Sequence, residues 1–436
     1  MKPAMARAHR EAAMATLAAT GGGVALLRTG AERIRNRDVH FRFRPDSDFW
    51  YLTGFPEPDA VAVLRPDADT ERYVLFVRPR DPELETWNGR RAGVEGAIEL
   101  YGADAAFPIE ALDTELPRLL RGAPRVLYAA GEDLDFDRKL LAWLRDSHVR
   151  SRDGVKMPEA VVHPGSILHE LRLIKSAEEI AIMRRCAELT DKGHRAAMSA
   201  LRPGLGEWEI EALVDGTFRG GGGWGPGYPS ICASGRNATI LHYNTNNERV
   251  PDGAMMLLDA GCEIDGYTAD VTRCFPSNGG FTAPQKELYE VVLAAQLAAV
   301  EHVAPGRPFL SVHEVALGRL VQGLIDLELL PAGVDAAIAS GAYRTYYMHR
   351  TSHWLGLDVH DVGAYYDAAR ESRPLVPGMV LTVEPGLYVP EHDERAPERF
   401  RGLGVRIEDD VLVTAQGHEV LTAAVPKSVA DVEALR

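Results

Sequence analysis

Four acidic residues in the carboxy-terminal part of the chain stand in apolar, strand-like runs. Asp259 ends the run MMLLD, Asp270 lies in the next such run, Glu384 follows VLTV, and Glu408 follows VRI. Carboxylates are rarely buried unless they are paired or bind a metal ion. A pair of divalent cations that share bridging carboxylates is the simplest arrangement that stabilises all four. Such a site typically activates a water molecule for hydrolysis.

A histidine-rich segment lies between the second and third of these acids along the chain. Residues 349–360 read HRTSHWLGLDVH and contain His349, His353 and His360. One imidazole and four hard oxygen ligands suit Mn²⁺, with Co²⁺, Fe²⁺ and Zn²⁺ as competitors. Spacing alone does not show which of the three histidines binds the metal.

The first two acids are expected to meet across a hairpin. Asp265-Gly266 is typical of a two-residue hairpin turn. That turn places Asp259 opposite Thr272, which lies two residues from Asp270 on the same face of its strand. Diagonal neighbours of this kind lie about 7–8 Å apart at the backbone. Both carboxylates can therefore reach one metal cluster.

The length and the pattern of elements predict two domains. A chain of 436 residues has room for two cores. Over residues 1–165, short apolar runs alternate with helical stretches, which predicts a small α/β domain. The turn-forming His163-Pro164-Gly165 marks the join. Residues 166–436 then form the domain that carries the acids.

The second domain shows a faint internal repeat. Capping boxes at Ser176–Glu179 and Thr282–Gln285 each begin a helix that ends before a Pro-Gly, and a second amphipathic helix follows. Each half then reaches a strand with the formula Gly-(x5)-acid-(Ala/Pro)-Gly, ending at Asp259 or Glu384. The pattern predicts an α+β domain duplicated about a pseudo-two-fold axis. The two acids would then be equivalent residues near that axis.

Bulk composition excludes several classes of partner. The formal net charge of −15 disfavours nucleic acid and anionic membrane surfaces. No apolar run approaches the roughly 20 residues that cross a bilayer. The four cysteines form no CxxC motif, which is typical of a protein from the reducing cytoplasm. Motifs of zincins, serine hydrolases and P-loop proteins are absent from the sequence.

Taken together, the motifs resemble those of Xaa-Pro aminopeptidase (aminopeptidase P), a member of the creatinase-like "pita-bread" metallopeptidases. Two segments of the amino-terminal domain, DSDFWYLTGF at 46–55 and WNGRR at 87–91, also resemble this family. The resemblance covers nearly the whole chain. In the second domain it rests on LLDAG, ADVTR, SHWLGLDVHD, TVEPG and RIED, which contain Asp259, Asp270, His353, Glu384 and Glu408.

The resemblance implies a role for each residue of the predicted site. His353 would be the imidazole ligand, Asp270 and Glu408 the bridging carboxylates, and Glu384 both a ligand and the general base. His242 and His360 would act near the scissile bond. The residues expected to contact or enclose the substrate are His349, Arg406, Tyr388, Trp87 and Asp38. The substrate would be a peptide with proline at its second position.

Two alternatives share the same metal ligands. A prolidase cleaves only Xaa-Pro dipeptides, but the segments at 46–55 and 87–91 favour the aminopeptidase. A binding protein that has lost catalysis is disfavoured by the complete set of ligands. Relatives suggest a homodimer or homotetramer, and some complete the active site across a subunit boundary.

Overall fold

The computed structural model describes residues 1–436 except 151–153, 155, 332 and 436. Its internal contacts divide the chain into two compact units, Met1–Leu171 and Arg172–Arg436. This division falls within helix α7 (Gly165–Leu173), six residues after the domain boundary expected between residues 165 and 166. The expected boundary stays a prediction. Among the described residues, no helix is both long and apolar enough to cross a membrane.

A six-stranded mixed sheet forms the centre of the amino-terminal unit. Its strand order is β6-β5-β4-β1-β7-β8, with antiparallel pairing of β4 to both β1 and β5 and parallel pairing elsewhere. Short apolar runs form most of these strands, as expected for the small α/β domain. Their bounds are β1 Val24–Arg28, β4 Val61–Leu64, β5 Tyr73–Val77, β6 Ala105–Pro108, β7 Arg125–Leu127 and β8 Ala160–Val162.

Helices flank this sheet and a small hairpin extends from the same unit. Apolar side chains of the helices α5 and α6 join the strands in one core. The hairpin is formed by β2 (Ile34–Asn36) and β3 (Val39–His40) and is exposed. The helices are α1 Pro3–Ala19, α2 Ser47–Thr53, α3 Pro82–Asn88, α4 Gly93–Glu99, α5 Leu112–Leu120 and α6 Leu134–Arg150, with a 3₁₀ turn η1 at Ile109–Ala111.

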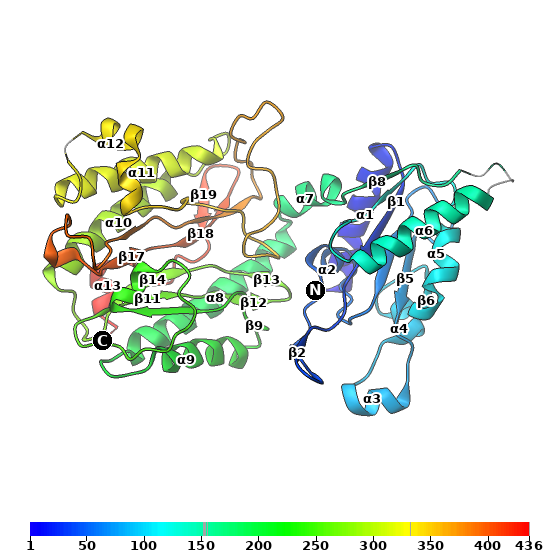
Figure 1. Ribbon diagram of the computed structural model, residues 1–436, viewed down its shortest axis with the longest axis horizontal. Coiled ribbons are helices and arrows are strands. Elements are labelled where there is room, and N and C mark those ends of the chain that lie inside the picture. Colours follow the sequence, from blue (N-terminus) through cyan, green and yellow to red (C-terminus); the bar gives the residue numbers. More distant parts are fainter. Residues whose placement is uncertain (151–153, 155, 332, 436) are drawn as a thin grey trace. The chain divides into compact units, whose positions relative to one another are not determined.

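The carboxy-terminal unit consists of two similar halves. In the first half, the paired helices α8 and α9 accompany the strands β9 to β14 (Figure 1). The capping box predicted at Ser176 and Glu179 is present at the start of α8. The bounds are α8 Ala177–Ala200, α9 Glu207–Gly220, β9 Gly225–Pro226, β10 Ile231–Ser234, η2 Gly235–Thr239, β11 Met255–Asp259, β12 Cys262–Ile264, β13 Tyr267–Thr268 and β14 Thr272–Pro276.

The second half repeats this order with the paired helices α10 and α11 and the strands β15 to β19. The capping box expected at Thr282 is formed, since its N–H donates to Gln285 Oε1 at 3.0 Å. The bounds are α10 Ala283–His302, α11 Phe309–Asp326, α12 Val334–Ser340, η3 Ala342–Thr345, β15 Val380–Val383, β16 Gly386–Tyr388, η4 Glu398–Phe400, β17 Gly404–Arg406, β18 Asp409–Val413, β19 His418–Val420 and α13 Val429–Glu433.

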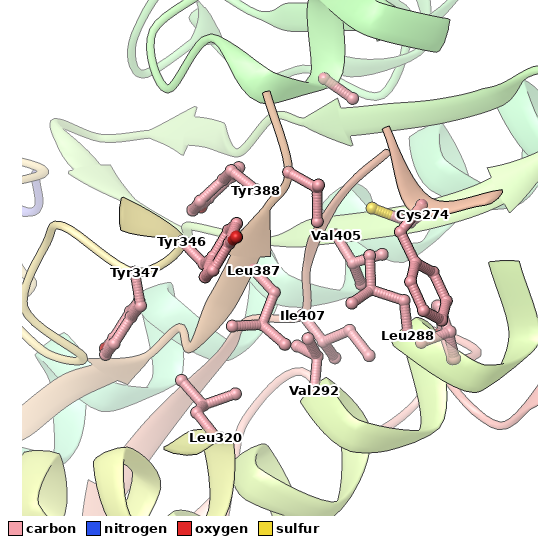
Figure 2. Close-up of a cluster of buried hydrophobic side chains, with 14 of the residues drawn as sticks. Cys274, Leu288, Val292, Leu320, Tyr346, Tyr347, Leu387, Tyr388, Val405 and Ile407 are labelled. Carbon is pink, nitrogen blue, oxygen red and sulfur yellow. The ribbon is translucent and has the colours of Figure 1, made fainter. Parts of the chain in front are cut away.

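A shared apolar core supports the strands of this unit. Figure 2 shows Leu288 and Val292 of α10 and Leu320 of α11 beneath Leu387 and Val405 of the β16–β17 hairpin. All five are buried. Because this core fixes the hairpin, it also fixes the polar residues that the hairpin presents on its other side.

The predicted register of the first hairpin is confirmed. Asp259 pairs with Thr272, and Ile264 pairs with Tyr267 across the Asp265-Gly266 turn. Asp265 adopts a positive φ of 53° and Gly266 one of 87°, as a primed two-residue turn requires. The hairpin is divided between two small sheets, β10-β11-β14 and β13-β12-β9.

Candidate metal centre and active site

Four of the five predicted metal ligands, the acids, lie at or beside the ends of strands in both halves of the carboxy-terminal unit. Asp259 is the last residue of β11, and Glu384 directly follows β15 at the equivalent position of the second half. Asp270 lies between β13 and β14, and Glu408 lies between β17 and β18. His353 is contributed by the irregular segment that precedes β15.

Three of these residues form the closest group. Ligand atoms of Asp270, His353 and Glu408 all lie within 4.8 Å of one another. His353 Nε2 is 3.4 Å from Asp270 Oδ2 and 3.7 Å from Glu384 Oε1. The other nitrogen of His353 lies 3.0 Å from the carbonyl oxygen of Trp354. Because a carbonyl can only accept, Nδ1 carries a hydrogen, and in the neutral ring Nε2 has its lone pair toward the acids.

Around this group lies a cavity of about 620 Å³. It is lined by all five predicted ligands and by four further residues singled out in the sequence: His242, His349, His360 and Arg406. Its apolar wall includes Ile231, Leu241, Val359 and Tyr365. The structure therefore brings nine of the predicted residues to one cavity.

Arg406 is tied to the acids within this cavity. Its guanidinium donates to Asp259 Oδ2 at 2.6 Å, to the Thr272 hydroxyl at 3.0 Å and to the Tyr388 hydroxyl at 3.0 Å. Tyr388 is buried and also lies 2.9 Å from His349 Nε2. Tyr388 does not line the cavity, so in this arrangement it connects two residues that do.

The backbone around Glu408 is fixed by a fully buried arginine. Arg273 donates to the carbonyl oxygens of Glu408, Pro426 and Val425, and pairs with Asp409 at 2.7 Å. The Glu408 side chain accepts from the Thr272 hydroxyl at 2.7 Å, and its N–H donates to the Thr272 carbonyl at 3.1 Å. These bonds join the two halves directly at the cluster.

A buried ion cluster anchors the segment that carries His360. The neighbouring residue, Asp361, is buried and pairs with Lys175 at 3.0 Å and with Arg172. Arg172 also reaches Asp358, whose side chain is 40% exposed, at 2.7 Å. Burial raises the pKa of Asp361, but the charges of Lys175 and Arg172 outweigh it and leave the pKa below its usual value. Asp361 is therefore ionised at neutral pH.

Burial and mutual repulsion dominate the electrostatics of the cluster. Burial raises the pKa of Glu384 to about 7, against the lowering effects of His353 and Arg406. Burial, followed by the charges of Asp270 and Glu384, raises the pKa of Glu408 well above its usual range. Burial opposes protonation of His353, but Asp270 and Glu384 outweigh it and raise its pKa to about 9. The carboxylates of the cavity thus lie close together in a buried setting, where they need protons or cations to balance their negative charge.

The donor set fits divalent cations. Carboxylates from four strand ends and one imidazole nitrogen face a common space, and an Mn²⁺-type ion takes such hard ligands. Because their pKa values are raised, the side chains of Glu408 and His353 hold protons, and a cation bound there would displace these protons. Asp259 and Glu384 lie outside the closest group, but both line the same cavity.

Two contacts of the cluster were missed by sequence reasoning. The Tyr228 hydroxyl lies 2.7 Å from Asp259 Oδ1 and 2.6 Å from Asp270 Oδ1. Thr272, which served only to set the register, binds both Glu408 and Arg406. Tyr228 lies in the irregular stretch that follows β9, where no periodicity indicates which way a side chain points. The predicted hairpin register, which places Thr272 opposite Asp259, was the available signal for Thr272.

Asp38 and Trp87 lie on the amino-terminal unit. Asp38 is exposed in the turn between β2 and β3, and Trp87 is 80% exposed near the end of α3. Their expected part in enclosing a substrate stays a prediction.

Comparison with known proteins identifies the family. Residues 181–415 match metallopeptidase family M24, and residues 6–128 match the aminopeptidase P amino-terminal domain. The chain is 44% identical to the Xaa-Pro aminopeptidase of Haemophilus influenzae over 94% of this chain and 92% of that protein, and 43% identical to the one of Escherichia coli over 95% and 93%.

Solved structures agree with these sequence relatives. The aminopeptidase PepP of Pseudomonas aeruginosa is similar with a TM-score of 0.97 and 49% identity, covering 100% of this chain and 98% of that one. Escherichia coli aminopeptidase P in complex with substrate is similar with a TM-score of 0.95 and 42% identity, with the same coverage. The chain therefore belongs to metallopeptidase family M24, with the pita-bread catalytic fold and an aminopeptidase P amino-terminal domain.

Proposed function

We propose that this chain is an Xaa-Pro aminopeptidase, which hydrolyses the bond between an N-terminal residue and a following proline. The observation that carries the proposal is the convergence of four carboxylates and His353 Nε2 on one cavity. The named relatives, which match nearly the full length of the chain, support the same activity.

Two divalent cations are proposed to be held by Asp259, Asp270, His353, Glu384 and Glu408, with Asp270 and Glu408 as bridges. Bound cations of this kind lower the pKa of water and polarise the scissile carbonyl. The hard ligand set favours Mn²⁺ over Co²⁺, Fe²⁺ and Zn²⁺. Metal analysis of the purified protein distinguishes these ions and counts them.

Glu384 is the proposed general base. It lines the cavity outside the closest group, with its carboxylate 3.7 Å from His353 and 3.8 Å from His349. A base in this position takes a proton from the attacking water and passes it to the leaving nitrogen. The leaving nitrogen must gain a proton when the amide bond breaks, and the proton that Glu384 takes from the water would supply it.

The remaining side chains of the cavity are proposed to bind the substrate. His242 and His360 act near the scissile bond, and His349, Arg406 and Tyr388 contact the proline side and the peptide backbone. Asp38 and Trp87 help to enclose the peptide. The apolar wall of Ile231, Leu241 and Val359 is suited to a pyrrolidine ring. A tertiary amide and a ring are thereby recognised by shape, because no N–H is available to bind.

The proposed setting is the cytoplasm, and the proposed assembly is a homodimer or homotetramer. All four cysteines are free and buried, as in proteins of reducing compartments. Sedimentation analysis of the purified protein measures the assembly.

The activity is tested with an Xaa-Pro-Xaa tripeptide and the matching Xaa-Pro dipeptide. Metal-stripped protein is assayed with and without added Mn²⁺. Release of the first residue from the tripeptide, restored by Mn²⁺, is the expected result. Cleavage of the dipeptide alone would make the chain a prolidase, and inactivity on both peptides after reconstitution would contradict an enzymatic role.

A further inference from the structure

A buried glutamate outside the cavity binds the segment that carries His242. Glu207 is the first residue of α9 and is 0% exposed. Its carboxylate accepts five hydrogen bonds. Oε1 accepts from the Ser234 N–H at 2.8 Å, from the Ser234 hydroxyl at 2.8 Å and from the Asn237 amide at 3.1 Å. Oε2 accepts from the Tyr243 hydroxyl at 2.7 Å and from the Glu248 N–H at 2.9 Å.

All of these donors belong to residues 234–248, which we call the His242 segment. After the short 3₁₀ helix η2, the part from Ile240 to Glu248 has no helix or strand of its own. A segment of this kind cannot satisfy its backbone groups internally, so an outside acceptor must hold it. Glu207 binds it at both ends and at Tyr243, directly beside His242.

A second buried side chain strengthens the same arrangement. Asn246 is 1% exposed and adopts a left-handed φ of 45°. Its side chain accepts from the Cys232 N–H at 2.9 Å and donates to the Ser230 carbonyl at 2.8 Å. The segment is therefore pinned to β10 by Asn246 and to α9 by Glu207.

The position of His242 depends on the hydrogen bonds that Glu207 and Asn246 make to the His242 segment. It is exposed to the cavity that it lines, and among the described residues it makes no hydrogen bond that would orient it. The adjoining Tyr243 is buried, with its hydroxyl on Glu207. The backbone on either side of His242, rather than contacts of its ring, sets where the imidazole lies.

We propose that Glu207 is a positioning residue for the reaction, which places His242 against the substrate through the His242 segment. This inference rests on the proposed function, because it assumes that His242 acts on the substrate. Glu207 does not line the cavity and makes no hydrogen bond to a metal ligand, so it can act on the reaction only through the residues that it binds. A misplacement of about 1 Å at such a residue can lower turnover by roughly a hundredfold.

Glu207→Gln is the informative variant. A glutamine offers one acceptor oxygen and one donor nitrogen, so one of the two backbone donors, Ser234 N–H or Glu248 N–H, loses its partner. We expect kcat for an Xaa-Pro-Xaa tripeptide to fall by about tenfold or more, with metal content and circular dichroism unchanged. Where this variant does not fold, Tyr243→Phe removes a single bond of the five and is measured in the same way.

The decisive measurement is a double-mutant cycle with His242→Ala. If Glu207 acts through His242, Glu207→Gln should lower kcat by less than about twofold further in the His242→Ala background. Glu179→Gln is the matched control. Glu179 is a buried glutamate in the first turn of α8 that likewise accepts from a backbone N–H, of Ser176, and from a tyrosine hydroxyl, of Tyr267. Its replacement should leave kcat unchanged.

The outcomes separate the inference from the proposed function. Losses that multiply independently in the double variant, or an equal loss in Glu179→Gln, would overturn the positioning role of Glu207 and leave the aminopeptidase assignment intact. Full turnover in His242→Ala would instead remove His242 from the proposed mechanism, and the role of Glu207 with it.

Discussion

The buried ion cluster of Asp361, Arg172 and Lys175, next to His360 in the chain, allows a quantitative prediction. Asp361 pairs with Arg172 at 2.5 Å and with Lys175 at 3.0 Å, and the side chains of all three are at most 3% exposed. Asp361→Asn removes the negative charge and leaves two buried cations facing a neutral amide. Loss of one partner from a buried ion pair costs about 3–5 kcal/mol. We expect the unfolding free energy of the carboxy-terminal unit to fall by that amount.

Asp358→Asn is the matched control, because Asp358 binds the same arginine from an exposed position. Its side chain is 40% exposed, and surface pairs of this kind contribute about 0–1 kcal/mol. The two units need not unfold together. The assay is therefore urea denaturation followed by hydrogen exchange of peptides from residues 172–176 and 354–363, with kcat measured in parallel.

The activity of Asp361→Asn should also fall, because the anchored segment carries His360 next to Asp361. The pH dependence follows from the depressed pKa of Asp361. In the unmodified protein, the stabilisation that ionised Asp361 gives the folded state is present above the ordinary carboxyl pKa of about 4. This stabilisation is lost as the pH falls below that value. Equal losses of stability in the two variants, or a loss below about 1 kcal/mol in Asp361→Asn, would refute the reasoning.

Three further changes have defined outcomes. Glu384→Gln should lower kcat by about 10²–10⁴-fold because it removes the proposed base, and near-normal rates would refute that role. Asp270→Asn should reduce the metal content measured by mass spectrometry, since it removes a proposed bridging ligand; unchanged content would contradict that assignment. His194 is buried with Nε2 on the Ala260 carbonyl, and burial lowers its pKa to about 4. As the pH falls from about 6.5 to about 4, His194 therefore binds a proton in the unfolded state before it does so in the folded state. The free energy of unfolding falls by up to about 3 kcal/mol over this range. His194→Gln should flatten this decline in acid denaturation curves, and an unchanged slope would show that His194 does not contribute.

The sequence alone predicted the elements that depend on local patterns. The hairpin register followed from the Asp265-Gly266 turn and from side-chain alternation, and the pairing of Asp259 with Thr272 confirms it. The capping box at Ser176 was predicted from two residues three positions apart. Such features involve neighbours in the chain, so composition and spacing are enough to specify them.

The cluster of acids was also predictable, for a thermodynamic reason. A carboxylate at the end of an apolar strand must be compensated, and four of them in one domain indicate a shared cation site. The repeated strand formula further indicated that Asp259 and Glu384 belong to equivalent positions. Residue types and their apolar surroundings were thus enough to predict a cation site before any distance was known.

Only the tertiary structure decided which side chains hold that chemistry in place. Tyr228 contacts both Asp259 and Asp270, and Arg406 binds Asp259. Glu207 binds the His242 segment, which begins 27 residues later in the chain. These contacts connect residues that share no turn, helix face or strand pair. Their partners are set by tertiary packing, within the first half and, for Arg406, across the two halves. A linear pattern of residue types does not specify that packing.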